Sequence, residues 1–161
     1  AFFDAQAAHI EPILEKEKTG LSVAFFAVAS DGTITVRKPN DYVSSMIELA
    51  GGTYSLNGYV PEEENALSTL KMQMEDFYAA EKDADILIYN GTIEGELTSI
   101  DELVQKNSLF ADFKAVKTGQ VYTTGSNFYQ QTSGTCDFIE DLNKVLNGET
   151  DAEYRFLKKI N

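Results

Sequence analysis

The chain has 161 residues, of which 43% are hydrophobic, and its 26 Asp and Glu against 13 Lys and Arg give a formal net charge of −13. This composition is enough for one hydrophobic core and excludes a disordered chain. The charge opposes binding to nucleic acid or to an anionic membrane surface, because both need clustered cations. The single cysteine, Cys136, excludes an intrachain disulfide and a cysteine-rich zinc site.

The first third of the chain predicts a helix followed by a β-hairpin. Apolar residues at helical spacing predict a helix over 1–18. The apolar run over 21–30 predicts a strand that is buried on both faces. The pair Asp31-Gly32 then predicts a tight turn into a second strand over 33–37.

The middle of the chain predicts two helices separated by irregular backbone. Asn40 or Asp41 caps the first helix, which ends at the pair Gly51-Gly52. Residues 53–64 show no regular pattern, whereas apolar spacing predicts a longer helix over 65–81.

The rest of the chain predicts two strands among further helices. Short apolar runs predict strands over 85–89 and 120–124. Three helices are expected in the same part: 99–106 with a capping box of Ser99 and Glu102, 135–147, and a terminal helix capped by Thr150 and Glu153.

The order of these elements predicts an α/β fold. We expect a single lobe of three layers, α/β/α, with helices on both faces of a mostly parallel sheet that contains one β-hairpin. In such sheets ligands bind beyond the carboxyl ends of the strands. That rule points to three segments, 30–37, 90–95 and 125–134.

Catalytic constellations are incomplete. Residues 29–33, ASDGT, are similar to the opening D-x-D-G-T motif of haloacid-dehalogenase-type phosphatases, but Ala29 stands at the position of the nucleophile. The hairpin turn on Asp31-Gly32 is the favoured interpretation. The only histidine, His9, has no nucleophile placed near it, and we expect Cys136 to be a packing residue. The sequence therefore predicts neither an enzyme nor a site for a bare transition-metal ion.

Four segments follow one another along the chain in a recognisable order. They are a helix at 1–14, a strand-to-helix segment ending in a glycine pair at 36–52, a helix-to-strand segment at 74–91, and the run A-V-K-x-G-x-V-Y within 110–130. Together they resemble the C-terminal lobe of the substrate-binding proteins of ABC importers for iron-siderophore, haem or cobalamin, the class III periplasmic binding proteins.

The resemblance implies the end of an interlobe helix over 1–20 and a C-terminal ligand-binding lobe over 21–161, with the family's N-terminal lobe absent from this chain. It implies capture of an iron chelate, haem or corrinoid and its delivery to a membrane permease, with no cofactor besides that ligand. It also implies a periplasmic or extracellular protein, a membrane-anchored lipoprotein whose signal and anchor are not in this chain.

The family places its ligand-binding residues on loops at the strand ends. Arg37 is expected to pair with an anionic chelate, while Tyr89 and Tyr129 offer aromatic faces and possible iron ligands. The full expected set is Ser30, Arg37, Tyr89, Asn90, Asn127, Tyr129 and Gln130. Glu75 stands where the family often has the glutamate that docks on the permease, although an ordinary exposed helix residue fits the same position.

Two other functions stay open from the sequence. A phosphatase-like α/β enzyme with a degenerate motif predicts magnesium-dependent turnover that depends on Asp31. A standalone interaction domain that uses acidic helix faces predicts a protein partner and no cleft for a small molecule.

Overall fold

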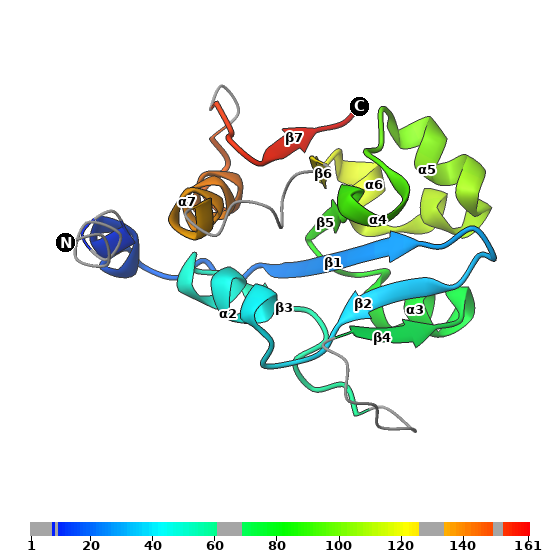
Figure 1. Ribbon diagram of the computed structural model, residues 1–161, viewed down its shortest axis with the longest axis horizontal. Helices are drawn as coiled ribbons and strands as arrows, with labels where there is room; N and C mark the ends of the chain where they lie inside the picture. The colour runs from blue at the N-terminus through cyan, green and yellow to red at the C-terminus, as the bar shows by residue number, and fades with distance from the viewer. Residues whose placement is uncertain (1–7, 9, 61–68, 126–133, 150–152) are drawn as a thin grey trace.

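A seven-stranded sheet forms the centre of the computed structural model, which describes residues 8, 10–60, 69–125, 134–149 and 153–161 (Figure 1). The strand order is β4-β2-β1-β5-β6-β7, and β3 pairs with β1 off this path. The strands are β1 (Ser22–Val28), β2 (Ile34–Arg37), β3 (Thr53–Tyr54), β4 (Thr69–Met72), β5 (Ile86–Tyr89), β6 (Val121–Thr124) and β7 (Leu157–Lys159). The helices are α2 (Tyr42–Leu49), α3 (Met74–Glu81), α4 (Gly91–Glu94), α5 (Ile100–Lys106), the 3-10 helix η1 (Ser108–Asp112), α6 (Lys114–Thr118) and α7 (Thr135–Leu146). Residues 10–14 are also helical.

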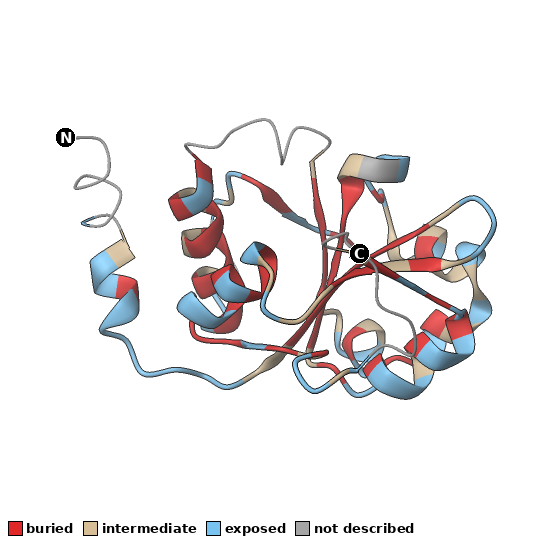
Figure 2. Ribbon diagram, turned by 60° about the horizontal axis from the view of Figure 1, so that its bottom comes forward, coloured by how far each residue is buried: buried red, intermediate tan, exposed pale blue. Residues whose placement is uncertain are grey.

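The centre of the sheet is parallel, as the sequence predicts. β1 runs parallel to β5, and β5 runs parallel to β6. Antiparallel strands extend the sheet on both sides, β2 and β4 beyond β1 and β7 beyond β6. Every residue of β1 after Ser22 is buried, because helices cover both faces of the sheet (Figure 2). The predicted three-layer α/β/α lobe with one β-hairpin is confirmed.

Aromatic rings fill the space between the sheet and α3. Phe26 of β1 lies 5.0 Å from Phe77 of α3 and 5.5 Å from Phe110 of η1, measured between ring centroids. Phe113 stacks on Phe77 at 5.7 Å. All four side chains are fully buried. Since each large ring removes a broad apolar surface from water, this cluster holds α3 and η1 against the sheet.

The turn and cap signals of the sequence form the predicted local structures. Gly32 has a positive φ of 86°, and the Asp31 carboxylate accepts a hydrogen bond of 3.0 Å from the Thr33 backbone N–H, which closes the turn between β1 and β2. Asp41 caps α2 and Ser99 caps α5, each by accepting a hydrogen bond from a backbone N–H of the first turn. The predicted hairpin and both capped helices are therefore confirmed.

The helix predicted over 65–81 is wrong in its first half. Thr69–Met72 forms β4, an edge strand antiparallel to β2, and the helix begins only at Met74. Buried Leu70 and Met72 flank exposed Lys71, a period of two that suits a strand. The same residues fit a helical spacing and a strand period. Pairing with β2 favours the strand, because without β4 the outer edge of β2 would leave a row of backbone N–H and C=O groups unpaired.

The predicted terminal helix is also wrong. Leu157–Lys159 forms β7, antiparallel to β6. The buried carboxylate of Asp141 on α7 accepts hydrogen bonds from the backbone N–H groups of Arg155 at 2.9 Å, Phe156 at 2.7 Å and Leu157 at 3.2 Å. These bonds hold the chain extended on its way to β6. Thr150, half of the predicted capping box, lies outside the described residues.

Several short elements have no signal in the sequence analysis. Thr53–Tyr54 pairs with the start of β1 as β3, in a segment predicted to be irregular. Helices α4 and α6 are only four and five residues long, too short to show a helical apolar period. None of the described helices is long and apolar enough to span a lipid bilayer.

Candidate functional site

The three central parallel strands, β1, β5 and β6, end at the same edge of the sheet. The turn at 29–33 follows β1, Asn90 and α4 follow β5, and Gly125 follows β6. The Asn90 N–H donates to the Phe26 carbonyl at 2.6 Å, and the Gly91 N–H donates to the Thr124 hydroxyl at 2.9 Å. These bonds tie the ends of the three strands together. We call residues 29–33, 90–96 and 124–125 the carboxyl edge.

Asn90 and Gly91 build the turn from β5 into α4. The side-chain Oδ1 of Asn90 accepts hydrogen bonds from the Thr92 N–H at 3.1 Å and the Thr92 hydroxyl at 2.6 Å, which caps α4. Only 5% of Asn90 is exposed, so the main role of this side chain is to stabilise the turn between β5 and α4. A Cβ at Gly91 would overlap the Thr124 carbonyl oxygen, so glycine alone permits this close approach of β5 and β6.

Gly91→Ala is expected to lower the free energy of unfolding by about 1–3 kcal/mol, because backbone at the Thr124 carbonyl must move to admit the methyl group. Urea unfolding followed by circular dichroism measures the change. Gly58→Ala is the matched control, since a Cβ at Gly58 meets no atom within 4 Å. An equal stability for the two variants would contradict the close approach.

Ser30 lies at the carboxyl edge as expected, exposed at the tip of the hairpin. Its neighbour Asp31 is engaged in the turn, where its carboxylate accepts hydrogen bonds from the Thr33 hydroxyl at 2.6 Å and the Thr33 N–H at 3.0 Å. These bonds hold the pKa of Asp31 below its ordinary value. An ionised carboxylate that is fixed in a turn, with Ala29 at the nucleophile position, does not form the phosphatase constellation.

Tyr89 is a core residue. Its side chain has no exposed surface, its ring packs edge-on against Phe26 at 5.5 Å, and its hydroxyl lies 3.4 Å from the backbone N and O of Val28. Burial raises the pKa of Tyr89, which disfavours the phenolate form that binds ferric iron. The expectation of an open aromatic face at this position is therefore corrected. A strand that is buried on both faces exposes no side chain before it ends.

Arg37 is the last residue of β2, one residue beyond the pair of Val36 with Phe26. β2 runs antiparallel to β1, with Ile34 opposite Val28, so the far end of β2 lies away from the carboxyl edge. The Arg37 Nε is 2.5 Å from the Asp41 carboxylate, and the guanidinium lies 4.9 Å from the centroid of the Tyr42 ring. The prediction that Arg37 lies with the loops at the strand ends is therefore wrong. The rule on carboxyl ends applies to the parallel strands, and β2 is not one of them.

The remaining predicted site residues divide into two groups. Asn127, Tyr129 and Gln130 lie outside the described residues. Glu75 is exposed in the first turn of α3. Of the predicted ligand-binding residues that the structure describes, it brings Ser30 and Asn90 to one edge and buries Tyr89 beside them. It leaves Arg37 at the far end of β2.

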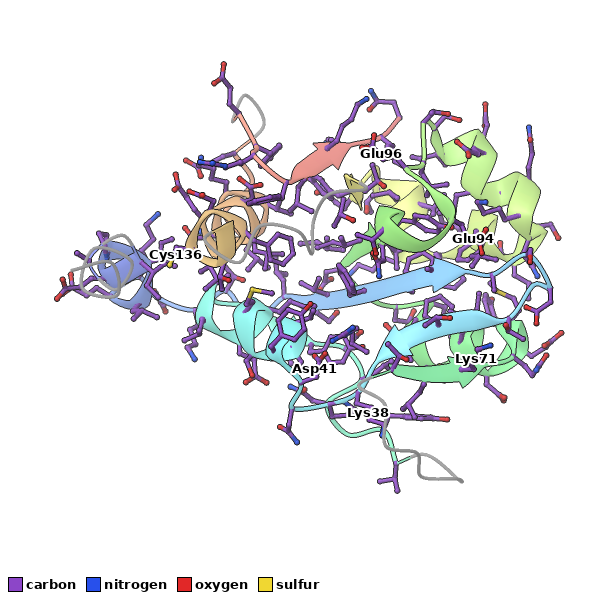
Figure 3. All side chains as sticks on the ribbon, viewed as in Figure 1. Lys38, Asp41, Lys71, Glu94, Glu96 and Cys136 are labelled. Atoms are coloured by element: carbon purple, nitrogen blue, oxygen red, sulfur yellow. The ribbon has the colours of Figure 1, made fainter. Side chains whose placement is uncertain are left out.

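The sequence analysis missed two charged residues of the carboxyl edge, Glu94 and Glu96. Glu94 and Glu96 flank Gly95 after α4, and both are exposed (Figure 3). They follow a predicted strand end, which is the signal that could have identified them. At the start of α5, hydrogen bonds from Thr98 hold the pKa of Glu102 below its ordinary value, so this carboxylate is also ionised.

Other reactive groups lie elsewhere or are buried. Burial raises the pKa of the Cys136 thiol, which is the behaviour of a packing residue. Within the described ranges, no three His, Cys, Asp or Glu side chains are grouped as metal ligands. A small cavity of about 40 Å³ lies at the opposite edge, between Ile13, Leu49 and Asn143, and it is too small for a chelate.

Comparison with solved structures shows the same fold in importer binding proteins. The chain is similar to the TroA-like periplasmic binding protein FepB from Veillonella parvula, with a TM-score of 0.68 and 13% identity over 99% of this chain and 54% of that one. It is similar to PiaA from Streptococcus pneumoniae TIGR4 in complex with ferrichrome, with a TM-score of 0.63 and 20% identity over 94% of this chain and 53% of that one. It is also similar to the siderophore periplasmic binding protein from the fuscachelin gene cluster of Thermobifida fusca, with a TM-score of 0.63 and 19% identity over 91% of this chain and 52% of that one.

No protein-family model matches the sequence, and no curated protein sequence matches it significantly. The similarity is therefore one of fold. The chain spans about half the length of the structures it matches, which are binding proteins. It resembles one lobe of the substrate-binding proteins of siderophore-type ABC importers.

Proposed function

We propose that the chain is the C-terminal lobe of a substrate-binding protein that captures a ferric chelate for an ABC importer. The observation that carries this proposal is the match of 91–99% of the chain to half of siderophore-type binding proteins. The gathering of the three strand ends at one edge supports it, because ligands of open α/β sheets bind there. The carboxyl edge would form one side of the ligand cleft.

The finer parts of this function belong to the same proposal. The ligand is an iron chelate, with haem or a corrinoid as alternatives. The protein works outside the cytoplasm, as an anchored lipoprotein, and delivers its ligand to a permease. Glu75, exposed on α3, is the proposed docking residue on this lobe. The N-terminal lobe of the family would supply the other side of the cleft.

The direct test is titration of the 161-residue chain with ferrichrome by isothermal calorimetry. One lobe supplies half of a cleft, so we expect saturable binding in about the 10 μM to 1 mM range rather than the tighter binding of a closed site. Haem and cobalamin are titrated in parallel. Absence of heat with every one of these ligands would contradict the proposed function.

A bulky residue at the edge gives a second test of the same site. Ser30→Trp is expected to weaken ferrichrome binding about tenfold, because the ring occupies space over the carboxyl edge. Ser45→Trp is the matched control, since Ser45 is exposed on α2 and far from the hairpin tip. Equal binding by both variants would place the ligand elsewhere.

A further inference from the structure

Cations are missing from the carboxyl edge. Among its residues, all of which the structure describes, the ionisable side chains are Asp31, Glu94 and Glu96, and there is no Lys or Arg. Arg37 lies at the end of β2 that points away from the carboxyl edge, and its Nε is paired with the Asp41 carboxylate at 2.5 Å. The cation that the sequence analysis assigned to an anionic ligand is therefore buried and already balanced by a carboxylate.

Two lysines close to the carboxyl edge, Lys71 and Lys106, each lie beside a carboxylate. Lys71 on β4 stabilises the ionised form of Asp31 at the hairpin. Lys106 on α5 stabilises ionised Glu102, and its Nζ lies 5.8 Å from the centroid of the buried Tyr89 ring. Neither lysine supplies positive charge in excess of the negative charge next to it.

Glu94 and Glu96 have no compensating partner of this kind. Both are exposed, and neither makes an ion pair with any residue that the structure describes (Figure 3). The formal net charge of −13 adds a repulsive field for any anion that approaches. A multiply charged anion that binds at this edge would pay the free-energy cost of desolvation, and no ion pair with a cation would offset that cost.

We infer that the carboxyl edge selects ferric chelates by charge, and that it accepts neutral or cationic trihydroxamate chelates and rejects anionic tricatecholate chelates. The inference rests on the proposed function and on the placement of the site by the strand ends. Neutral groups suit such ligands, because the Ser30 hydroxyl can donate to a hydroxamate oxygen and the Thr92 hydroxyl, whose proton goes to Asn90, can accept from an amide N–H. Glu94 and Glu96 add attraction for a cationic ligand.

Three ferric chelates of different charge test this inference on the 161-residue chain. They are ferrioxamine B, which is cationic, ferrichrome, which is neutral, and ferric enterobactin, which is a trianion. Calorimetry is expected to give the tightest binding for ferrioxamine B, then ferrichrome, with ferric enterobactin at least about tenfold weaker than ferrichrome. Added salt is expected to weaken ferrioxamine B and to leave ferrichrome unchanged.

A double variant tests the two glutamates. Glu94→Gln with Glu96→Gln is expected to weaken ferrioxamine B about three- to tenfold and to leave ferrichrome unchanged, because each exposed charge contributes modestly. Glu11→Gln with Glu15→Gln removes the same charge from exposed positions near the start of the chain and is expected to change neither affinity.

The outcomes separate the two proposals. If ferric enterobactin binds as tightly as ferrichrome or more tightly, the charge inference is overturned while the proposed function stands. If the double variant binds ferrioxamine B as the parent chain does, the role of Glu94 and Glu96 is overturned. If none of the three chelates binds, the inference is overturned, and if haem and cobalamin do not bind either, the proposed function is overturned as well.

Discussion

Glu81→Gln is expected to stabilise the protein at pH 8 by about 2–3 kcal/mol and to remove most of the difference in stability between pH 5 and pH 8. Glu81 is the last residue of α3 and has no exposed surface. Neither of its carboxylate oxygens has a hydrogen-bond partner in the structure. A buried carboxylate without a partner is costly when it is charged.

The pKa of Glu81 follows from this environment. Burial raises the pKa to about 7, from an ordinary value of 4.5. The Ser55 hydroxyl acts in the opposite direction but offsets only part of the burial, because its proton is donated to the Val23 carbonyl at 2.9 Å. Ionised Glu81 would also lie close to Tyr54, whose pKa is raised by burial and by this carboxylate.

The sign of the pH effect is set by the raised pKa. Between pH 4.5 and about 7 the folded protein keeps a proton on Glu81 that the unfolded chain has released. The contribution to stability is therefore full below pH 4.5, falls as the pH rises toward 7, and is lost above that. Gln carries no charge at any pH, so it does not show this loss.

Urea unfolding of the parent chain and Glu81→Gln at several pH values between 5 and 8 measures the effect. The difference between the two proteins isolates Glu81 from the other carboxylates. Glu75→Gln, at an exposed position of the same helix, is the control and is expected to change stability by less than about 0.5 kcal/mol. A gap between Glu81→Gln and the parent that does not widen with pH would contradict this account.

Asp141→Ala is expected to lower the free energy of unfolding by about 3–5 kcal/mol, because it leaves several backbone N–H groups without an acceptor. Asp141 is 2% exposed. Its carboxylate accepts hydrogen bonds from the backbone N–H groups of Arg155, Phe156 and Leu157, at the start of β7. Loss of the acceptor should release β7 from β6 as well as destabilise the whole lobe.

Asp137→Ala on the same helix is the control for this variant. Asp137 makes an ion pair of 3.1 Å with Arg155, whose side chain is 63% exposed, so its removal should cost about 1 kcal/mol or less. Urea unfolding gives the stabilities, and amide hydrogen exchange at Leu157 and Lys159 reports the pairing of β7. Equal stability of the two variants would show that Asp141 does not hold this strand.

The central strands and helix α2 could be predicted from the sequence because their signals are local. The helix predicted over 1–18 is helical at 10–14 and not at 15–18. The apolar run of β1 and the short run of β5 are each buried, and the Asp31-Gly32 pair closes the hairpin between β1 and β2. The edge strands could not be predicted in this way. β4 and β7 are short, and each is selected by a neighbour distant in sequence, β4 by β2 and β7 by β6 and the Asp141 carboxylate.

The candidate site was predicted in outline and not in its residues. The rule on strand ends correctly located Ser30 and Asn90 at one edge. It failed for Arg37 because β2 runs antiparallel to β1, away from the carboxyl edge. The predicted hairpin already implied this direction, so the sequence alone could have excluded Arg37. Tyr89 is the last residue of a fully buried strand, and its direction depends on packing against Phe26, which no local pattern shows.

The most direct test of the account is to locate a bound chelate by nuclear magnetic resonance. Ferric iron in ferrichrome broadens the signals of nearby amide protons, and the gallium chelate, which is diamagnetic, serves as the control. The account predicts that ferrichrome broadens the signals of residues 30–32 and 90–96 before those of Arg37 at the far end of β2 and of Gly51 and Asn143 at the opposite edge. Broadening centred on Arg37 or Gly51, or no broadening beyond that of the gallium control, would contradict it.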